Sequence, residues 1–186
     1  MRNREIKKWH KLSSGLLQST RVFDLYVQRL KSPISDYEDD FYYIEVVDWV
    51  NLIAVTKEKE VILIEQFRFG IHENTLEIPG GMLDSREEDP AAAALRELEE
   101  ETGYVAKECV SLGYVHPNPA IQTNRCHFFY AEGVVPSSVQ NLDPAEDIRV
   151  QLVPLSEVPK LIAEHKITHS LVVCAFQKYF AAIGEL

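Results

Sequence analysis

Four glutamates gather in the second half of one short segment, residues 90–102, in a pattern that suits metal binding. Glu97, Glu100 and Glu101 are three or four residues apart, so on a helix they share one face. Like charges at this spacing cost about 0.2–0.5 kcal/mol per pair, and acids near a helix C-terminus are unfavourable. Mg²⁺ and Mn²⁺ prefer oxygen ligands held on a rigid element. The pattern indicates a divalent cation site, and a solvated acidic face is the alternative.

Strong start and stop signals predict that this segment is a helix. Asp89 is a good cap and Pro90 suits the first helical position, while Gly103 is typical of the residue after a helix. We therefore expect a helix over residues 90–102. Its apolar stripe, which we expect to face the sheet, consists of Ala94, Leu95 and Leu98.

The residues before the helix add groups of the same kind. Pro79, Gly80 and Gly81 predict a tight turn, where backbone carbonyls can approach a metal ion closely. Glu88 stands just before the helix cap and could fold back over the acidic face. Carboxylates and exposed backbone are thus expected to meet at one place.

Residues 81–104 resemble the signature of the Nudix hydrolases. That signature is a Gly, five residues, a Glu, seven residues, then Arg-Glu-apolar-x-Glu-Glu-x-Gly-apolar. The matching residues are Arg96, Glu97, Leu98, Glu100, Glu101, Gly103 and Tyr104, and Glu88 stands seven residues before Arg96. Six residues rather than five separate Gly81 from Glu88. Either the loop has one extra residue or Glu87 takes the role, and we favour the insertion because surface loops absorb residues easily.

The resemblance implies a chemistry and a role for each matching residue. Nudix enzymes cleave the pyrophosphate link of nucleoside diphosphate compounds with water, and divalent ions offset the negative charge. Metal ligation by Glu97, Glu101, Glu100 and the Gly80 carbonyl is implied, with Mg²⁺ as the cofactor and Mn²⁺ as the alternative. Arg96 would orient the acids, and Glu88 would support them.

The base that deprotonates the water is expected on a later loop. In the subgroup that hydrolyses ADP-ribose and related sugars, a Glu well after the signature often has this role. The matching segment here is "NLDPAEDIRV", residues 141–150. Glu146 is our first candidate and Asp143 the second, and the alternative is that both are ordinary loop acids.

The segment "IEQFRFGIHENTLEIPGG" resembles the ADP-ribose and nucleoside diphosphate sugar pyrophosphatases. In these, an Arg after the strand contacts phosphate and a Glu precedes the glycine pair by three residues, which correspond to Arg68 and Glu77. A planar guanidinium pairs well with phosphate oxygens. The implied reaction converts ADP-ribose or a related nucleoside diphosphate sugar to a nucleoside monophosphate and a sugar phosphate. The alternatives are another nucleoside diphosphate derivative, such as a dinucleoside polyphosphate or a nucleotide, or a non-catalytic binding module.

Further residues have side chains suited to binding. Phe23, Tyr26 or Trp49 could stack on a base, although core packing is the alternative for each. His165 and His169 are four apart and could chelate zinc on a helix. No HExxH glutamate lies between them and no third ligand is evident, so we set zinc aside.

The remaining segments predict the fold. Alternating and β-branched patterns indicate strands near residues 21–30, 39–56, 61–69, 110–115, 126–135 and 148–155. Two helices follow, at 156–165 with Ser156 as a candidate N-cap, and at 169–183. Strands with helices between and after them predict a mixed sheet sandwiched by helices, an α/β (α+β) class that agrees with the α/β/α sandwich of the Nudix family.

We divide the chain into two parts. Residues 1–45 are predicted to be a strand-rich extension, which in the resembling subgroup helps to build a homodimer, and residues 46–186 are the predicted Nudix catalytic domain. The alternative is that the first strands extend the main sheet.

Composition restricts the partners. The net charge of −10 argues against a nucleic-acid or membrane partner, since both need a basic surface. The three cysteines are widely spaced without a CxxC, the start lacks the apolar segment of a signal peptide, and no apolar run is long enough to span a membrane. We therefore expect a cytoplasmic enzyme acting on a small molecule.

Overall fold

The chain divides into two compact units, each described here by itself. The structure is a computed structural model that describes residues 5–137 and 139–184. Within these residues, the first unit comprises the chain up to residue 46 together with 116–124. The second unit comprises 47–115 and the chain from 125 onward.

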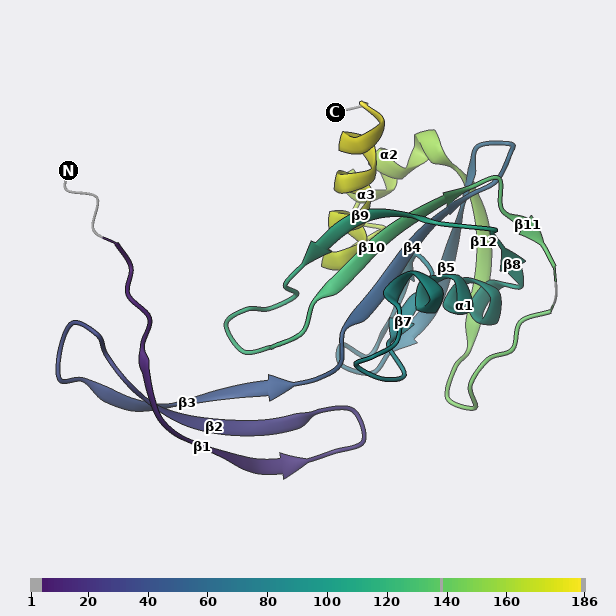
Figure 1. The fold of residues 1–186 in the computed structure, drawn as a ribbon. Coiled ribbons are helices and arrows are strands. Elements are labelled where there is room, and N and C mark those ends of the chain that lie inside the picture. Colours follow the sequence, from purple (N-terminus) through teal and green to yellow (C-terminus); the bar gives the residue numbers. More distant parts are fainter. Residues whose placement is uncertain (1–4, 138, 185–186) are drawn as a thin grey trace. The chain divides into compact units, whose positions relative to one another are not determined.

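The first unit is built on a three-stranded antiparallel sheet in the order β1-β2-β3 (Figure 1). Its strands are β1 (His10–Ser19), β2 (Asp24–Lys31) and β3 (Glu38–Glu45). Tyr26 and Tyr43 stack across β2 and β3 with ring centroids 5.2 Å apart. All ten positions of β1 are exposed, and its sequence, HKLSSGLLQS, does not alternate regularly between apolar and polar residues, which is the pattern by which strands are predicted.

A seven-stranded mixed sheet forms the centre of the second unit. It contains β4 (Trp49–Val55), β5 (Glu60–Arg68), β6 (Glu73–Glu77), β7 (Gly80–Met82), β9 (Val110–Val115), β10 (Cys126–Glu132) and β12 (Ile148–Pro154). The order is β12-β5-β4-β10-β9, with β6 beside β5 and β7 beside β4. The β4–β10 pair is parallel, whereas the other pairs are antiparallel. The short strands β8 (Tyr104–Val105) and β11 (Val135–Pro136) pair separately.

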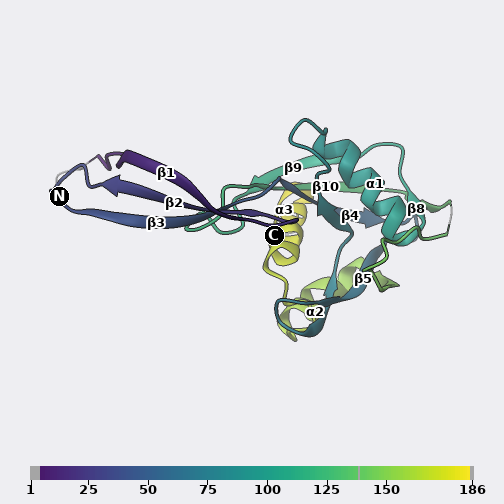
Figure 2. The ribbon, with the colours of Figure 1, turned by 90° about the horizontal axis from the view of Figure 1, so that it is seen from below.

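Helices cover both faces of this sheet (Figure 2). They are α1 (Pro90–Thr102), α2 (Val158–Ala163), which follows the 3₁₀ turn η1 (Leu155–Glu157), and α3 (Ser170–Ile183). The alternating residues of β4 belong to two separate clusters. Val50, Leu52 and Ala54 pack with the apolar side of α1, whereas Ile53 and Val55 pack with α3. The predicted sandwich is therefore confirmed, and β4 is apolar except for Asn51 because both of its faces are buried.

Helix α1 begins and ends where its sequence signals predict. Asp89 accepts hydrogen bonds from the N–H groups of Ala91 and Ala92, and Gly103 adopts the left-handed conformation at φ 72°. Ala94 and Leu98 are fully buried against the sheet. The glutamates lie on the other side of the helix.

Two sequence predictions are corrected. Ser156 is not the cap of α2, because it lies inside η1 and the cap position is held by Glu157 without a side-chain bond. The stretch 39–56 was predicted as continuous strand, but it is divided into β3 and β4, which belong to different sheets. Among the described residues, no helix is long and apolar enough to cross a membrane.

The main sheet opens at one end between its central strands. β4 and β5 are paired only at Val55 and Val61. Beyond that point β7 takes the edge of β4 and β6 takes the edge of β5. The turn that joins β6 to β7 consists of Ile78 and Pro79, and the Pro79 carbonyl accepts a hydrogen bond from the Leu52 N–H of β4 at 2.9 Å.

Candidate functional site

A cavity of about 470 Å³ lies beside the glycine turn and the acidic side of α1. We call it the acidic cavity. Most of the predicted site residues line it, together with several that were not predicted. The lining residues are Gln66, Arg68, Gly80, Gly81, Met82, Asp84, Arg96, Glu97, Glu100, Glu101, Asn141, Asp143 and Glu146.

The two glycines allow the strand and the helix to approach closely. A methyl group at Gly80 would overlap the backbone carbonyl of Val50, and one at Gly81 would overlap the carboxylate of Glu97. The Gly80 N–H donates to Glu101 at 2.9 Å. Gly80 and Gly81 therefore bring the β7 backbone against the carboxylates, as the turn motif predicts.

Burial perturbs two of these carboxylates strongly. Burial raises the pKa of Glu97 to about 7, with Glu100 and Glu146 adding repulsion and Arg96 opposing the shift. The pKa of Glu101 is raised well above its usual value by burial, with repulsion from Glu97 and Glu146 adding to it. Burial therefore disfavours the charged form of both carboxylates in the folded protein.

The guanidinium of Arg96 makes hydrogen bonds to neighbouring carboxylates. It donates to Glu97 at 3.0 Å, to Glu100 at 2.9 Å and more weakly to Glu88 at 3.4 Å. Burial alone would lower the pKa of Arg96, but the surrounding carboxylates raise it. Arg96 is therefore a permanent cation that orients these side chains.

The extra loop residue is accommodated before Glu88. The Glu88 carboxylate accepts from the Asp84 N–H at 2.6 Å as well as from Arg96, whereas Glu87 is exposed. Glu88 does not line the acidic cavity. The structure thus brings Glu88, and not Glu87, to the arginine of the signature.

The loop that carries Glu146 is attached to the C-terminus of α1. The Gln140 side-chain amide donates to the Glu101 carbonyl at 2.6 Å, and the Asn141 N–H donates to the Glu100 carbonyl at 2.9 Å. Glu146 in turn accepts from the Asp143 N–H at 2.9 Å. These bonds satisfy carbonyls that a helix end leaves open and bring both candidate bases to the acidic cavity.

Arg68 and Glu77 bind each other. The guanidinium makes two hydrogen bonds of 2.7 Å to the Glu77 carboxylate, which also accepts from Thr75 at 2.5 Å. Burial by itself would raise the pKa of Glu77, but its bonds to Arg68 outweigh burial and lower that pKa. Arg68 lines the cavity with its position fixed, and Glu77, which is 1% exposed, holds it there.

The donor set of the acidic cavity suits hard divalent cations. The carboxylates of Glu97, Glu100 and Glu101 and the backbone at Gly80 offer only oxygen ligands. In the described parts of the chain, no three acidic, histidine or cysteine side chains are grouped closely enough to hold a metal as they stand. Glu97 and Glu100 are bound to Arg96, and Glu101 to the Gly80 N–H. The oxygen donors fit a cation, whose charge would favour the ionised form of the buried carboxylates, and the side chains would need to turn toward it.

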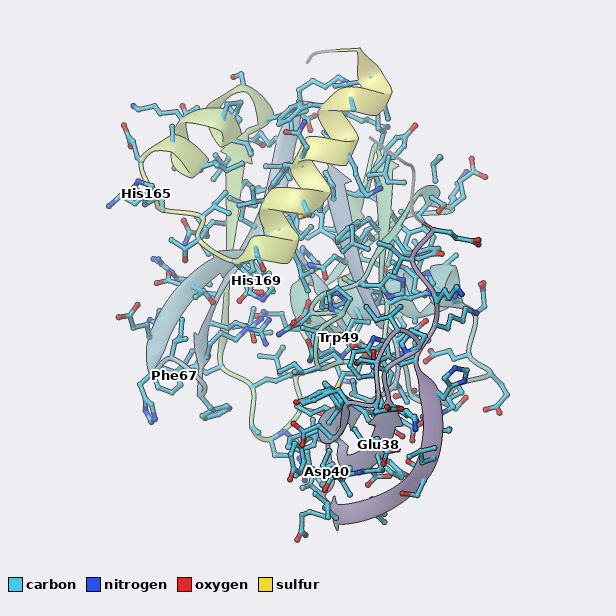
Figure 3. All side chains as sticks on the ribbon, turned by 90° about the vertical axis from the view of Figure 1, so that its left-hand side faces the viewer. Glu38, Asp40, Trp49, Phe67, His165 and His169 are labelled. Carbon is cyan, nitrogen blue, oxygen red and sulfur yellow. The ribbon has the colours of Figure 1, made fainter. Side chains whose placement is uncertain are left out.

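The two histidines lie apart in the fold (Figure 3). His165 follows α2 in the left-handed conformation at φ 57°, and His169 is the residue before α3. They therefore share no helix, and the pair does not form the helical chelate that their spacing suggested.

Sequence reasoning missed several residues of the acidic cavity. Gln66 faces it from β5, Asp84 from the loop before α1, and Asn141 from the later loop. For Asn141, the sequence gives one local indication, since this residue lies two positions before the candidate base Asp143. The positions of Gln66 and Asp84 at the cavity depend on the pairing of strands and on the path of a loop, which the sequence does not reveal.

Comparisons with known proteins agree with this fold. Residues 48–176 match the sequence model of the NUDIX domain. An ADP-ribose pyrophosphatase of Bacillus subtilis (strain 168) is 33% identical over 160 residues, which are 86% of this chain and 85% of that protein. A GDP-mannose pyrophosphatase of Escherichia coli O9:H4 (strain HS) is 32% identical over 127 residues, 62% of this chain and 64% of its own. The crystal structure of an ADP compounds hydrolase superposes with a TM-score of 0.84 at 19% identity, covering 99% of this chain and 100% of that one.

A mixed sheet between helices, with a glycine turn held against a glutamate-rich helix, defines a Nudix-type hydrolase fold. The chain belongs to the Nudix family. Divalent metal dependence is typical of that family.

Proposed function

We propose that this protein hydrolyses the pyrophosphate bond of ADP-ribose or of a related nucleoside diphosphate sugar, giving a nucleoside monophosphate and a sugar phosphate. The observation that carries the proposal is the acidic cavity itself. A guanidinium held by Glu77, that of Arg68, and a set of buried and half-buried carboxylates line the same space of about 470 Å³. This volume falls within the range of about 300–1,000 Å³ that is usual for small-molecule sites.

The charges of the cavity explain why a diphosphate would need bound cations in order to enter it. Glu97, Glu100 and Glu101 would repel a diphosphate, whereas Arg68 attracts one. Bound divalent ions, which we propose to be Mg²⁺ with Mn²⁺ as a substitute, would neutralise both sets of anions and make a water molecule more acidic. The three glutamates, with the Gly80 carbonyl, are the proposed ligands.

Each remaining residue has a proposed task that its contacts support. Arg68 binds phosphate oxygens, and Glu77 keeps its guanidinium in place. Arg96 and Glu88 orient the glutamates of α1. Glu146 lines the same cavity and accepts the proton of the attacking water, with Asp143 as the second candidate.

The relatives narrow the substrate without fixing it. The two relatives found by sequence are named for ADP-ribose and for GDP-mannose, which are both nucleoside diphosphate sugars. A dinucleoside polyphosphate or a free nucleotide is the alternative substrate for the same chemistry. A non-catalytic binding module is less consistent with the site, because all three glutamates of the signature are retained.

A product assay tests the proposal. The protein is incubated with ADP-ribose, GDP-mannose, a dinucleoside polyphosphate and ATP, each with Mg²⁺ and with EDTA. We expect AMP and ribose 5-phosphate from ADP-ribose, or GMP and mannose 1-phosphate from GDP-mannose, with Mg²⁺ only. Cleavage of only the polyphosphate or ATP would favour the alternative substrates, and no cleavage of any compound would contradict an enzymatic role.

We also propose that the protein is a homodimer in the cytoplasm. The first unit exposes apolar side chains on β1, including Leu12, Leu16 and Leu17, which a second subunit would cover. The three cysteines are free thiols, which suits a reducing compartment.

A further inference from the structure

Arg68 is the first of three side chains in contact, and the third is His169. The Arg68 guanidinium makes two hydrogen bonds of 2.7 Å to Glu77, and Glu77 Oε2 lies 3.9 Å from Nε2 of His169. All three residues line a cavity of about 270 Å³, and Arg68 lines the acidic cavity as well. The proposed phosphate-binding residue is therefore joined, through one carboxylate, to a histidine that lies outside the acidic cavity (Figure 3).

The contact between His169 and Glu77 is electrostatic. A distance of 3.9 Å is within the range of an ion pair and too long for a hydrogen bond. The Glu77 carboxylate is buried, so solvent ions screen its charge poorly. A change of charge on His169 would therefore act on Glu77, and through Glu77 on the guanidinium of Arg68.

Helix capping does not explain the presence of His169. It is the N-cap residue of α3, but its side chain makes no capping hydrogen bond, and Nδ1 is buried without a partner among the described residues. The charged groups that act on the ring are Glu77 from β6 and Arg68 from β5. From β4, the uncharged Trp49 and Asn51 line the same cavity. Of these groups, Glu77 alone favours a protonated ring.

The protonation state of His169 sets the net charge of the three side chains. Burial lowers the pKa of His169, while Glu77 opposes this shift and Arg68 adds to it. The ring is therefore neutral at pH 7 and gains its proton only below the usual value of 6.5. When the ring is neutral, the charges of Arg68 and Glu77 cancel. When it is protonated, one positive charge remains beside the acidic cavity.

We propose that His169 is a positioning residue that acts on Arg68 through Glu77, so that protonation of His169 strengthens the binding of a diphosphate at Arg68. The proposal rests on the hydrolytic function proposed above, in which Arg68 binds phosphate oxygens. A protonated His169 attracts the Glu77 carboxylate, and the guanidinium is then less neutralised by its partner. Because such coupling is reciprocal, an anion bound at Arg68 favours the proton on His169.

Calorimetry tests this linkage without turnover. A nonhydrolysable ADP-ribose analogue is titrated with Mg²⁺ present, at pH 6, in buffers of different ionisation enthalpy, which gives the number of protons taken up on binding. The diphosphate keeps the same charge between pH 5.5 and pH 8, so the protons come from the protein. The wild type should take up more protons than His169→Asn. Between pH 8 and pH 5.5 its affinity should gain about threefold to tenfold more than that of the variant, as expected for one added charge nearby.

Matched variants separate this linkage from other effects. Asparagine is a good helix cap, so His169→Asn should keep α3 intact, and His169→Gln is a second variant of closer size. His165→Asn, four residues earlier and outside the cavity, should match the wild type. Glu97 also titrates in this pH range, but it does so in every variant, so the difference between proteins reports on His169. A role in packing alone would change affinity by the same factor at every pH.

Nuclear magnetic resonance of the histidine rings tests the contact in the free protein. The His169 signal is the one missing from the spectrum of His169→Asn. Glu77→Gln removes the charge that favours the protonated ring, so the His169 pKa should fall further, and adding the analogue to the wild type should raise it. An unchanged His169 pKa in Glu77→Gln, or equal proton uptake by the wild type and His169→Asn, would overturn the proposal.

The outcomes distinguish failure of this inference from failure of the proposed function. If ADP-ribose is cleaved while the wild type and His169→Asn take up protons equally, the linkage is wrong and the hydrolase stands. If proton uptake depends on His169 while no diphosphate is cleaved, the linkage stands and the hydrolytic function is wrong. Failure of the analogue to bind would overturn the phosphate role of Arg68 and the linkage together.

Discussion

At the scale of single residues, Glu101 shows most clearly that the site buries a carboxylate in an unfavourable environment. The residue is 3% exposed, and its carboxylate accepts a hydrogen bond from the Gly80 N–H. Burial raises its pKa well above the usual value, which means that the folded protein does not stabilise the bare anion. A residue with this environment is a candidate for function rather than for stability.

Glu101→Gln should lower kcat by two orders of magnitude or more, because it removes a proposed metal ligand. The fold should tolerate the change, since a glutamine oxygen still accepts from Gly80 and a buried charge is removed. Turnover of ADP-ribose with Mg²⁺ and urea unfolding measure the two effects. Glu99→Gln, on the exposed side of the same helix, is the control and should match the wild type. Full activity of Glu101→Gln would show that the proposed ligand set is wrong.

Glu77 contributes stability in a pH-dependent manner. Its pKa is lowered in the folded protein, so its contribution is complete above the unfolded value of 4.5 and is lost as pH falls through the folded pKa. Glu77→Gln should reduce the free energy of unfolding at pH 7 by about 1–2 kcal/mol, a value moderated because Arg68 is partly solvated.

The pH dependence separates this ion pair from simple packing. Urea unfolding of the wild type and of Glu77→Gln at pH 7 and pH 3.5 should show the difference between them shrinking at the lower pH. A difference that stays constant would mean that the charge of Glu77 is not what stabilises the pair.

At the scale of elements, α1 and the loop at residues 140–146 form one functional piece. Gln140 and Asn141 bind the carbonyls of Glu101 and Glu100, and the same loop carries Glu146. These N–H donors satisfy backbone carbonyls at the end of α1, where the acidic side chains alone would be unfavourable. The helix end positions the proposed ligands and the proposed base together.

Gln140→Ala should loosen this attachment. Because Gln140 does not line the cavity, we expect kcat to fall about fivefold to twentyfold with KM nearly unchanged, as Glu146 loses its fixed position. Hydrogen exchange should become faster at the amide of Asn141. Gln151→Ala, which removes a hydrogen bond to Glu65 away from this loop, is the control. Faster exchange with unchanged kcat would remove Glu146 from the proposed base role.

Elements whose ends are marked by particular residues could be predicted from the sequence. Elements and contacts that depend on residues far apart in the chain could not. Asp89, Pro90 and Gly103 fix α1 within the chain, so its bounds could be read from the sequence. β1 could not, because all ten of its positions are exposed and no alternation marks it. The Arg68–Glu77 pair joins residues nine apart on neighbouring strands, and whether they face a ligand or each other depends on the hairpin between them. The docking of Gln140 on α1 likewise has no sequence pattern.

For the whole molecule, the net charge of −10 and the exposed apolar residues of the first unit have different consequences. The charge opposes non-specific binding to other anions and makes recruitment of cations a condition for any phosphate substrate. The exposed leucines of β1 favour association with a surface of the same kind.

Sedimentation tests the proposed homodimer. We expect a species of twice the chain mass of 21.3 kDa at micromolar concentration. Leu16→Glu places a charge on β1 and should shift the equilibrium toward the monomer, whereas Ser13→Glu on the same strand should have a smaller effect. A monomer at all concentrations would contradict the proposed assembly and leave the site of the second unit unaffected.

The central claim is that the acidic cavity holds divalent cations against a diphosphate. Electron paramagnetic resonance of Mn²⁺ measures this directly, because bound and free ions give different signals. With a nonhydrolysable ADP-ribose analogue present, the wild type and Glu99→Gln should deplete the free Mn²⁺ signal, and the Glu97→Gln/Glu101→Gln double variant should leave it intact. Equal depletion by the double variant and the wild type would contradict the account.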